Sequence, residues 1–221
     1  MADGFHPPLE EYLETVHSLA EEGTPVIQAR IAERLGRSAP SVSEMLDRLE
    51  GEGYLQRSGR LVELTPSGEA VATKVVRRHR LAERLLVDVI GLAWHKAHLE
   101  AGRWEHVISD DVEERLVVLL GDPATCPHGN PIPGAGRRLD RPGLGPLAKV
   151  APGHNVRLER ISEEVELDMD SLVLLDHAGF IPGAVGRVSR HEADGTCVVV
   201  VSGTELAVPE TLAAKLFVTP A

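Results

Sequence analysis

The sequence of 221 residues predicts an α+β fold in several parts, and three observations support this prediction. Apolar residues recur mostly at helical spacing from Glu10 to Leu120. Glycine and proline then crowd residues 121–153. Short β-type runs separated by glycine turns follow. We expect a winged-helix domain at 1–75, a helical domain at 76–122, a Pro/Gly-rich linker at 123–153 and a small β-barrel or sandwich at 154–221.

The amino-terminal part has the pattern of a helix-turn-helix followed by a hairpin. A short helix predicted over 27–35 ends at a glycine, and the next helix, over 38–49, opens with capping serines and a proline in its first turn. Residues 54–64 alternate around a glycine turn, as the strands of a small hairpin do. This hairpin would be the wing of a winged helix. A long helix is predicted to follow, from Thr65 to about Ile90.

A winged helix places the amino-terminal end of its second helix in the major groove, where short side chains reach bases and phosphates. Ser38, Pro40 and Ser41 suit that position. The arginines expected along the phosphate backbone are Arg30, Arg34, Arg37, Arg48, Arg57 and Arg60. Residues 1–75 carry 13 acidic and 7 basic side chains, so we expect weak binding unless negative charge is neutralised. A protein-interaction module is the alternative.

Imidazole and carboxylate side chains repeat at helical spacing in the helical part. One pair stands four residues apart, and a second group would share one side of a single helix over 98–106, at about 3.6 residues per turn. Such a mixture of ligand types predicts divalent ions. A merely charged surface is the alternative, although it would favour Glu–Lys pairs. The residues at these positions are His79, Glu83, His98, Gly102, Glu105 and His106.

Composition restricts the other classes of function. The formal net charge of −11 argues against general affinity for nucleic acid, but not against a local basic surface. Cys126 and Cys197 lack Cys-x-x-Cys spacing, so neither a disulfide framework nor a structural zinc site is indicated. No apolar run approaches the roughly 18 residues of a membrane helix, and the amino terminus has no leader pattern. We therefore expect no membrane partner and a cytoplasmic location.

The carboxy-terminal part combines short β-type runs with one helical segment. Predicted strands include 156–158, 185–188 and 197–201. Only Ser171–His177 has a helical pattern. Short strands between glycine turns favour a small barrel or sandwich.

Four segments are typical of one protein family and occur here in the family's order: 29–35 (ARIAERL), 79–86 (HRLAERLL), 103–107 (RWEHV) and 129–134 (GNPIPG). On these segments the chain closely resembles the diphtheria-toxin-repressor family of metal-dependent transcription regulators, with its manganese-type subgroup favoured. The resemblance implies a homodimer that represses metal-homeostasis genes at a palindromic operator in double-stranded DNA. It also implies a winged helix, a helical dimerisation domain and a small β-barrel of the Src-homology type.

The resemblance further implies two ions per subunit, with the metal as co-repressor. The ancillary site would comprise His79, Glu83, His98, Glu163 and Glu166. The primary site would comprise Glu11, the backbone carbonyl of Gly102, Glu105 and His106, with Glu14 as an extra ligand. An ion that joins the first helix to this site would neutralise clustered carboxylates and set the spacing of the two DNA-reading heads.

Three positions depart from the family pattern. Iron-type members resembling this chain have methionine and cysteine where it has Glu11 and Gly102, and manganese-type members have carboxylates at both. With sulfur absent, the oxygen and nitrogen ligands suit Mn(II) or Fe(II), and we favour Mn(II). Glu44 replaces the glutamine that the family can use toward DNA. The expected DNA-contact set is Arg30, Arg37, Ser38, Pro40, Ser41, Glu44, Arg48 and Arg60.

Two other functions compete with this one. Histidine and glutamate on facing helices can hold two ions for hydrolysis, but the sequence offers neither a nucleophile nor a phosphate-binding glycine loop. The other alternative is a winged-helix regulator that responds to a non-metal signal. Operator binding that survives chelation of metal would favour that alternative.

Overall fold

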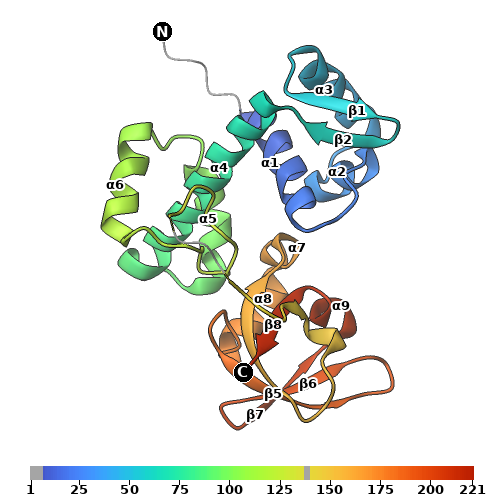
Figure 1. Ribbon diagram of the computed structural model, residues 1–221, viewed down its shortest axis with the longest axis vertical. Coiled ribbons are helices and arrows are strands. Elements are labelled where there is room, and N and C mark those ends of the chain that lie inside the picture. Colours follow the sequence, from blue (N-terminus) through green and yellow to red (C-terminus); the bar gives the residue numbers. More distant parts are fainter. Residues whose placement is uncertain (1–6, 137–139) are drawn as a thin grey trace. The chain divides into compact units, whose positions relative to one another are not determined.

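The computed structural model describes residues 7–136 and 140–221, and the chain forms two compact units (Figure 1). Unit 1 comprises Met1–His79 and Gly102–Glu113, and unit 2 comprises Arg80–Ala101 and Glu114–Ala221. The boundaries expected from the sequence, at residues 75, 122 and 153, stay predictions. The expected lack of a leader concerns residues 1–6 and lies outside the described residues. No helix in the described part has the length and apolar character needed to span a membrane.

Unit 1 contains the winged helix that the sequence predicts. α2 ends at Gly36, whose φ of 60° suits glycine. The Ser38 hydroxyl caps the next helix by accepting the N–H of Ser41 at 3.4 Å. The wing is an antiparallel hairpin with Ser58 opposite Leu61. The elements are α1 (Pro7–Glu21), α2 (Gln28–Leu35), α3 (Ala39–Gly51), β1 (Leu55–Ser58), β2 (Leu61–Leu64) and the first part of α4 (Pro66–Arg84).

One apolar core holds the winged helix together. Its buried side chains include Leu13 and Val16 from α1, Ile31 from α2, and Leu46 and Leu49 from α3. Burying a side chain of this size contributes about 1.5–3 kcal/mol. α1 is therefore fixed against the helix-turn-helix by one of its faces.

The helical part begins as the sequence predicts and departs from the prediction at one point. Helical backbone continues from α4 to Ile90, because a π-helical segment, η1 (Leu85–Ile90), follows α4 directly. A short 3-10 turn, η2 (Trp94–Lys96), precedes α5 (Ala97–Trp104), and α6 spans Asp110–Leu120. The expected single helix over 98–106 is wrong at its end. α5 stops at Trp104, and Glu105 and His106 lie in the turn that follows.

Unit 2 also contains a six-stranded antiparallel sheet in the order β3-β8-β4-β5-β6-β7. Register shifts between Leu158 and Arg160 in β4, and between Val188 and Arg190 in β5, bend these strands toward a barrel. Fully buried Phe180 belongs to the core beneath the sheet. The strands are β3 (Gly145–Pro146), β4 (Asn155–Ile161), β5 (Val185–His191), β6 (Cys197–Val201), β7 (Thr204–Val208) and β8 (Leu216–Pro220).

The three predicted strands of this part are confirmed as parts of β4, β5 and β6, but the prediction of a single helical segment is wrong. α8 spans Met169–His177, and two further helices, α7 (Glu163–Glu166) and α9 (Glu210–Ala213), have four residues each. One turn of helix is too short to produce an apolar periodicity in the sequence. A 3-10 turn, η3 (Leu147–Lys149), completes the elements of unit 2.

Part of the Pro/Gly-rich segment is buried in unit 2 and held against β4. His128 and Asn130 are buried, and the His128 carbonyl accepts the N–H of Ile161 at 3.1 Å. The Asn130 amide donates to the Ile161 carbonyl, also at 3.1 Å. A Cβ atom at Gly129 would lie 2.0 Å from the Glu159 carbonyl oxygen, so this close approach requires glycine.

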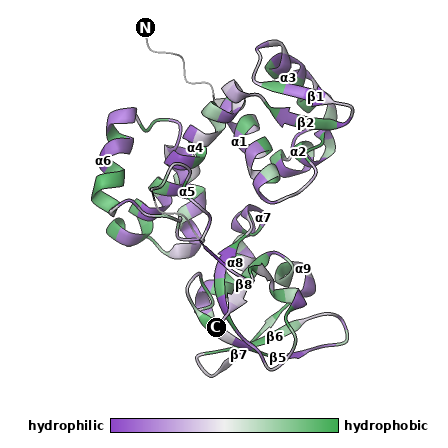
Figure 2. Ribbon diagram, viewed as in Figure 1, coloured by the Kyte–Doolittle hydropathy of each residue, from purple (hydrophilic) through white to green (hydrophobic). Residues whose placement is uncertain are grey.

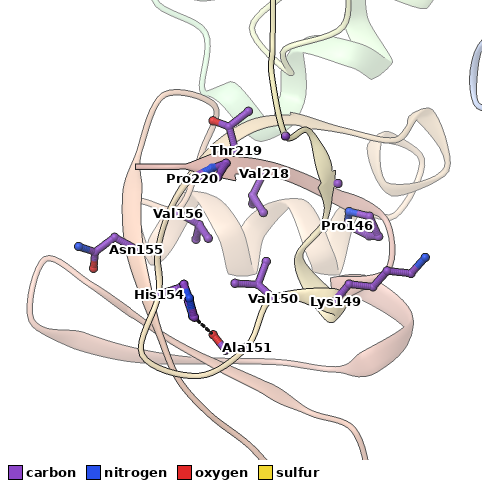
Figure 3. A pocket seen from close by; sticks show the side chains of 12 residues that line it. Pro146, Lys149, Val150, Ala151, His154, Asn155, Val156, Val218, Thr219 and Pro220 are labelled. Carbon is purple, nitrogen blue, oxygen red and sulfur yellow. Dashed lines mark hydrogen bonds between the residues drawn. The ribbon is translucent and has the colours of Figure 1, made fainter.

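A pocket of about 350 Å³ lies between β8, the start of β4 and the loop before it (Figure 3). Valine and proline side chains dominate its walls. Lys149 and His154 are the titratable groups among its lining residues, and His154 Nδ1 lies 3.1 Å from the Ala151 carbonyl oxygen. Because these walls bring no carboxylate and imidazole groups together, the candidate site lies elsewhere.

Candidate metal centre

Five titratable side chains of unit 1 lie together and are called the unit 1 cluster: Glu10, Glu14, His79, Glu105 and His106. α1 supplies the first two, α4 supplies His79, and the turn after α5 supplies the others. His106 Nδ1 lies 2.5 Å from a Glu10 carboxylate oxygen, and its Nε2 lies 3.0 Å from a Glu105 oxygen. His79 Nδ1 contacts the other Glu105 oxygen. Ligand atoms of Glu14, His79 and Glu105 lie within 4.8 Å of one another.

The electrostatics of the unit 1 cluster favour a cation at its centre. Burial raises the pKa of Glu105, but hydrogen bonds with His106 and His79 outweigh burial and bring this pKa to about 2. Hydrogen bonds to Glu10 and Glu105 raise the pKa of His106 to about 10. Glu10 and Glu105 therefore hold a proton on His106, and a divalent ion would supply the positive charge that these carboxylates favour. The oxygen and nitrogen donors fit Mn(II) or Fe(II).

One residue expected at this ion, Glu11, has other surroundings in the structure. The Glu11 carboxylate is 43% exposed and lies 4.0 Å from the Arg37 guanidinium, whereas the neighbouring Glu10 contacts His106. Gly102 lies in the last turn of α5, where backbone carbonyls lack a partner further along the helix. Ligation by Glu11, Glu14 and Gly102 stays a prediction, and Glu10 is a further candidate that was not predicted from the sequence.

A second group of side chains, called the unit 2 cluster, comprises Glu83, His98, His128 and Glu166. They come from the end of α4, the start of α5, the Pro/Gly-rich segment and α7. His98 Nδ1 lies 3.2 Å from Glu83 Oε1 and 3.0 Å from Glu166 Oε2. His128 Nδ1 lies 3.1 Å and 3.2 Å from the same two oxygens. Two nitrogen and two oxygen atoms thus alternate around one centre.

The unit 2 cluster is almost completely shielded from solvent. Glu83 and His128 are fully buried. Burial lowers the pKa of His128, but the charges of Glu83 and Glu166 outweigh burial and raise this pKa well above its usual value. Burial raises the pKa of Glu166, but the His128 charge and the hydrogen bonds with His128 and His98 together outweigh burial, so this pKa is lowered. The Asn130 amide donates to the other Glu166 oxygen at 2.5 Å. Buried carboxylates need compensating positive charge, so this donor set also fits a divalent ion.

The structure brings together three residues of the expected ancillary site, Glu83, His98 and Glu166. His79 contacts Glu105 within unit 1, and Glu163 is half-buried in the first turn of α7, so their ligation in the ancillary site stays a prediction. His128 was not predicted as a ligand, because it lies in the Pro/Gly-rich segment.

A signal for His128 was present in the sequence: Cys126 and His128 stand two residues apart among residues that break regular structure. The Cys126 thiol lies within 4.8 Å of ligand atoms of Glu83 and His128. Burial, with the Glu83 charge, raises the pKa of this thiol to about 11. Cys126 is therefore a protonated thiol at neutral pH when no metal is bound.

The expected DNA-contact residues Ser38, Pro40, Ser41, Glu44 and Arg48 are all exposed on α3 or at its cap. Their exposure on the second helix of the helix-turn-helix leaves this surface open to a DNA groove.

The arginines around this surface differ in their availability. Arg30 pairs with Glu33 at 2.8 Å and Arg48 with Glu52 at 2.7 Å, one turn away on the same helical stretch. Arg60 lies exposed in the wing and has no ion pair within the described part of the chain.

Two arginines have structural partners instead. Arg57 joins the wing to α3 by contacts of 2.5 Å with both Asp47 and Glu50. Arg34 is nearly buried against Glu22 at 2.8 Å, so the expectation that Arg34 lines the DNA backbone is wrong.

Three family descriptions match successive parts of the chain. "Iron dependent repressor, N-terminal DNA binding domain" matches residues 5–61, "Iron dependent repressor, metal binding and dimerisation domain" matches 65–134, and "FeoA domain" matches 145–220. Together these matches span most of the sequence.

Curated proteins and solved structures show the same likeness. The iron-dependent repressor IdeR of Mycobacterium tuberculosis is 43% identical over 218 residues, which cover 92% of this chain and 93% of that protein. The diphtheria toxin repressor of Corynebacterium diphtheriae is 41% identical over 216 residues, with coverages of 92% and 93%. The structure described as "Manganese-dependent transcriptional repressor complex with manganese" has a TM-score of 0.84 and 30% identity, covering 96% of this chain and all of that chain.

Proposed function

The chain belongs to the iron-dependent repressor family, and we propose that a divalent ion bound by the unit 1 cluster is the co-repressor that enables its DNA binding. It is a metal-dependent transcriptional repressor with a DNA-binding domain and a dimerisation domain. Because its relatives are regulators and not enzymes, the hydrolase alternative is dropped. The expected cytoplasmic location stays a prediction.

The position of α1 within unit 1 is the observation that carries the proposal. Leu13 and Val16 of α1 pack in the core of the winged helix. Glu10, on the same helix, contacts His106 of the unit 1 cluster, and Glu14 lies within reach of Glu105. Any force that draws these carboxylates toward the cluster therefore acts directly on the helix that supports the DNA-reading elements.

The side chains of the unit 1 cluster determine what is needed to draw the carboxylates of α1 toward it. A bound divalent ion supplies concentrated positive charge and preferred directions for its ligands. Without that charge, Glu10, Glu14 and Glu105 repel one another unless the imidazoles are protonated. His106 gives up its proton when it acts as a ligand, so binding exchanges a proton for a metal ion.

We propose two ions per subunit, one in each cluster, with Mn(II) or Fe(II) as the co-repressor. No sulfur atom belongs to the unit 1 cluster, and carboxylate oxygen with imidazole nitrogen suits both ions. The relatives include proteins named as iron-dependent and manganese-dependent repressors. We favour Mn(II) because carboxylates outnumber imidazoles among these five side chains.

The protein is a homodimer, and we propose that an exposed apolar surface of unit 2 forms part of the contact between subunits. Leu99 is 60% exposed, Val118 is 74% exposed and Leu119 is 62% exposed. The hydrophobic residues along the α6 helix are visible in Figure 2. A contiguous exposed patch of apolar side chains commonly marks a protein interface. A two-fold dimer presents two identical reading helices, which matches a palindromic operator.

DNA binding requires a local change of partners at the arginines. Arg30 and Arg48 must exchange a carboxylate for a phosphate, whereas Arg60 is available for a phosphate at once. Because α3 also carries Glu44 on its exposed surface, neutralising negative charge nearby would strengthen binding. This dependence on charge is consistent with a metal that acts as co-repressor.

The test is to incubate chelator-stripped protein with fragments of the source organism's genomic DNA. The arms contain Mn(II), Fe(II) under anaerobic conditions, or no metal. The proposal predicts that a palindromic site is enriched only when metal is present, and the two metal arms rank the ions. Equal enrichment without metal would instead favour a regulator with a different signal.

A further inference from the structure

Resting on the proposed function, we infer that His128 is a ligand of the metal ion in the unit 2 cluster, in addition to Glu83, His98 and Glu166. This assigns the Pro/Gly-rich segment a role in metal binding. It also makes the unit 2 cluster richer in nitrogen than the ligand set that family resemblance implies.

The distances within the cluster support ligation by His128 Nδ1. This atom lies 3.1 Å from Glu83 Oε1 and 3.2 Å from Glu166 Oε2, as His98 Nδ1 does at 3.2 Å and 3.0 Å. With metal–ligand bonds of about 2.1 Å, neighbouring ligand atoms are about 3.0 Å apart in octahedral geometry and about 3.4 Å apart in tetrahedral geometry. All four nitrogen–oxygen separations fall within this range, so His98 and His128 are equally well placed to bind one shared ion.

A purely structural histidine explains the arrangement less well. One N–H group directs its hydrogen bond mainly to one acceptor, but each Nδ1 atom lies against carboxylates from two different residues. In addition, His128 Nε2 is buried with no hydrogen-bond partner among the described residues. Both carboxylate contacts of this ring are made by Nδ1. A shared ion satisfies both oxygens and both Nδ1 atoms together.

The surrounding structure holds the His128 ring in a defined position. Its carbonyl accepts the N–H of Ile161 at 3.1 Å, and its ring lies 4.7 Å from the Trp94 ring, centroid to centroid. The Trp94 indole N–H donates to the Pro127 carbonyl at 3.0 Å. Gly129 allows the backbone to approach β4 closely. A ligand held in this way is preorganised, which favours metal binding.

Ligation by His128 affects which ion the unit 2 cluster prefers. A set of two imidazoles and two carboxylates suits Zn(II) and similar later ions better than a set dominated by carboxylates does. The unit 1 cluster contains three carboxylates and two imidazoles, so the two clusters differ in chemistry. We therefore expect Zn(II) to fill the unit 2 cluster more readily than Mn(II).

The test counts the imidazole ligands of bound Zn(II) by X-ray absorption spectroscopy. Full-length His106→Ala protein is the starting point, because it has lost a ligand in the unit 1 cluster. Adding His128→Phe keeps an aromatic ring beside Trp94 but removes the nitrogen. We expect one imidazole fewer in the double variant and an affinity for Zn(II) reduced more than 100-fold, beyond the roughly 10–100-fold effect of a residue that only supports a ligand.

Two further variants separate ligation from a structural role. His128→Gln keeps an amide that can donate to the carboxylates, so restored affinity in this variant would overturn the inference. The His128→Gln variant also replaces the His128→Phe variant in the test if circular dichroism shows that the latter is unfolded. His95→Phe is the matched control, because His95 belongs to unit 2 and lies 2.5 Å from Asp176. It should leave the imidazole count unchanged.

The remaining outcomes distinguish this inference from the proposed function. An unchanged imidazole count after His128→Phe, or no Zn(II) binding by the His106→Ala protein, would overturn the assignment of His128. Loss of one imidazole would support the assignment even if metal had no effect on DNA binding. In that case only the co-repressor proposal would fail.

Discussion

Metal binding at the unit 1 cluster is predicted to release a proton, because the pKa of His106 is raised to about 10 by its hydrogen bonds to Glu10 and Glu105. The imidazole must be neutral to bind an ion. At pH 7 its pKa lies about three units above the solution pH, which weakens metal binding about 1000-fold, or about 4 kcal/mol. Because His106 is only partly buried and Glu10 is 30% exposed, solvent screening makes this figure an upper limit.

The direction of the pH dependence of metal affinity follows from the competition between a proton and the metal ion for His106. Below pH 10 the metal-free cluster holds the proton, so affinity for Mn(II) should rise about tenfold per pH unit from pH 7 to pH 8.5. A histidine with an ordinary pKa near 6.5 would have lost its proton already and would give almost no slope in this range. The carboxylate of Glu105 adds no slope, because its pKa is lowered to about 2.

Calorimetric titration with Mn(II) under argon, in buffers of different ionisation enthalpy, measures both affinity and proton release. The titrations use His98→Ala protein, in which the unit 2 cluster has lost a ligand. We expect about one proton released per ion. The Glu69→Gln protein serves as a control, because the change alters a different carboxylate–histidine pair of unit 1. In that pair a Glu69 carboxylate oxygen lies 3.2 Å from His17 Nδ1. Affinity independent of pH between 7.5 and 8.5, with no proton release, would show that the metal ion does not displace a proton from His106.

Three other predictions concern the dimer, the DNA contact and the core. Leu119→Glu places a charge on the exposed apolar surface of α6 and should shift sedimentation from dimer to monomer; an intact dimer would remove Leu119 from the interface. Arg60→Ala should weaken DNA binding and lower the slope of log affinity against log salt by about 0.9, and an unchanged slope would show that Arg60 contacts no phosphate. Phe180→Ala should lower the free energy of unfolding in urea by about 3–5 kcal/mol; a loss below about 1 kcal/mol would contradict its place in the core.

Local signals made the winged helix predictable from the sequence. The glycine after α2, the capping Ser38 and the proline in the first turn of α3 each act within a few residues. The same holds for the β1–β2 hairpin, whose glycine turn separates two alternating strands. In contrast, α7 and α9 have only four residues each, so no periodicity identifies them. Their positions depend on packing in unit 2.

The candidate sites were predictable where ligands share a helix or a turn, and less so elsewhere. Glu105 and His106 are adjacent in the sequence, and the structure keeps them together. Glu10 and Glu11 are neighbours on one helix, about 100° apart around its axis, so sequence alone does not say which of them faces His106. His128 reaches its cluster only because a segment rich in proline and glycine folds back against β4.

A metal titration of operator binding by wild-type and His106→Ala proteins tests most directly whether the unit 1 cluster holds the co-repressor ion. Fluorescence anisotropy of a labelled operator fragment gives the affinity at each Mn(II) concentration, and sedimentation checks that both proteins remain dimers. We expect Mn(II) to strengthen binding by the wild type and to have no effect on the His106→Ala protein. Full metal dependence in the variant would show that the co-repressor ion does not act through the unit 1 cluster.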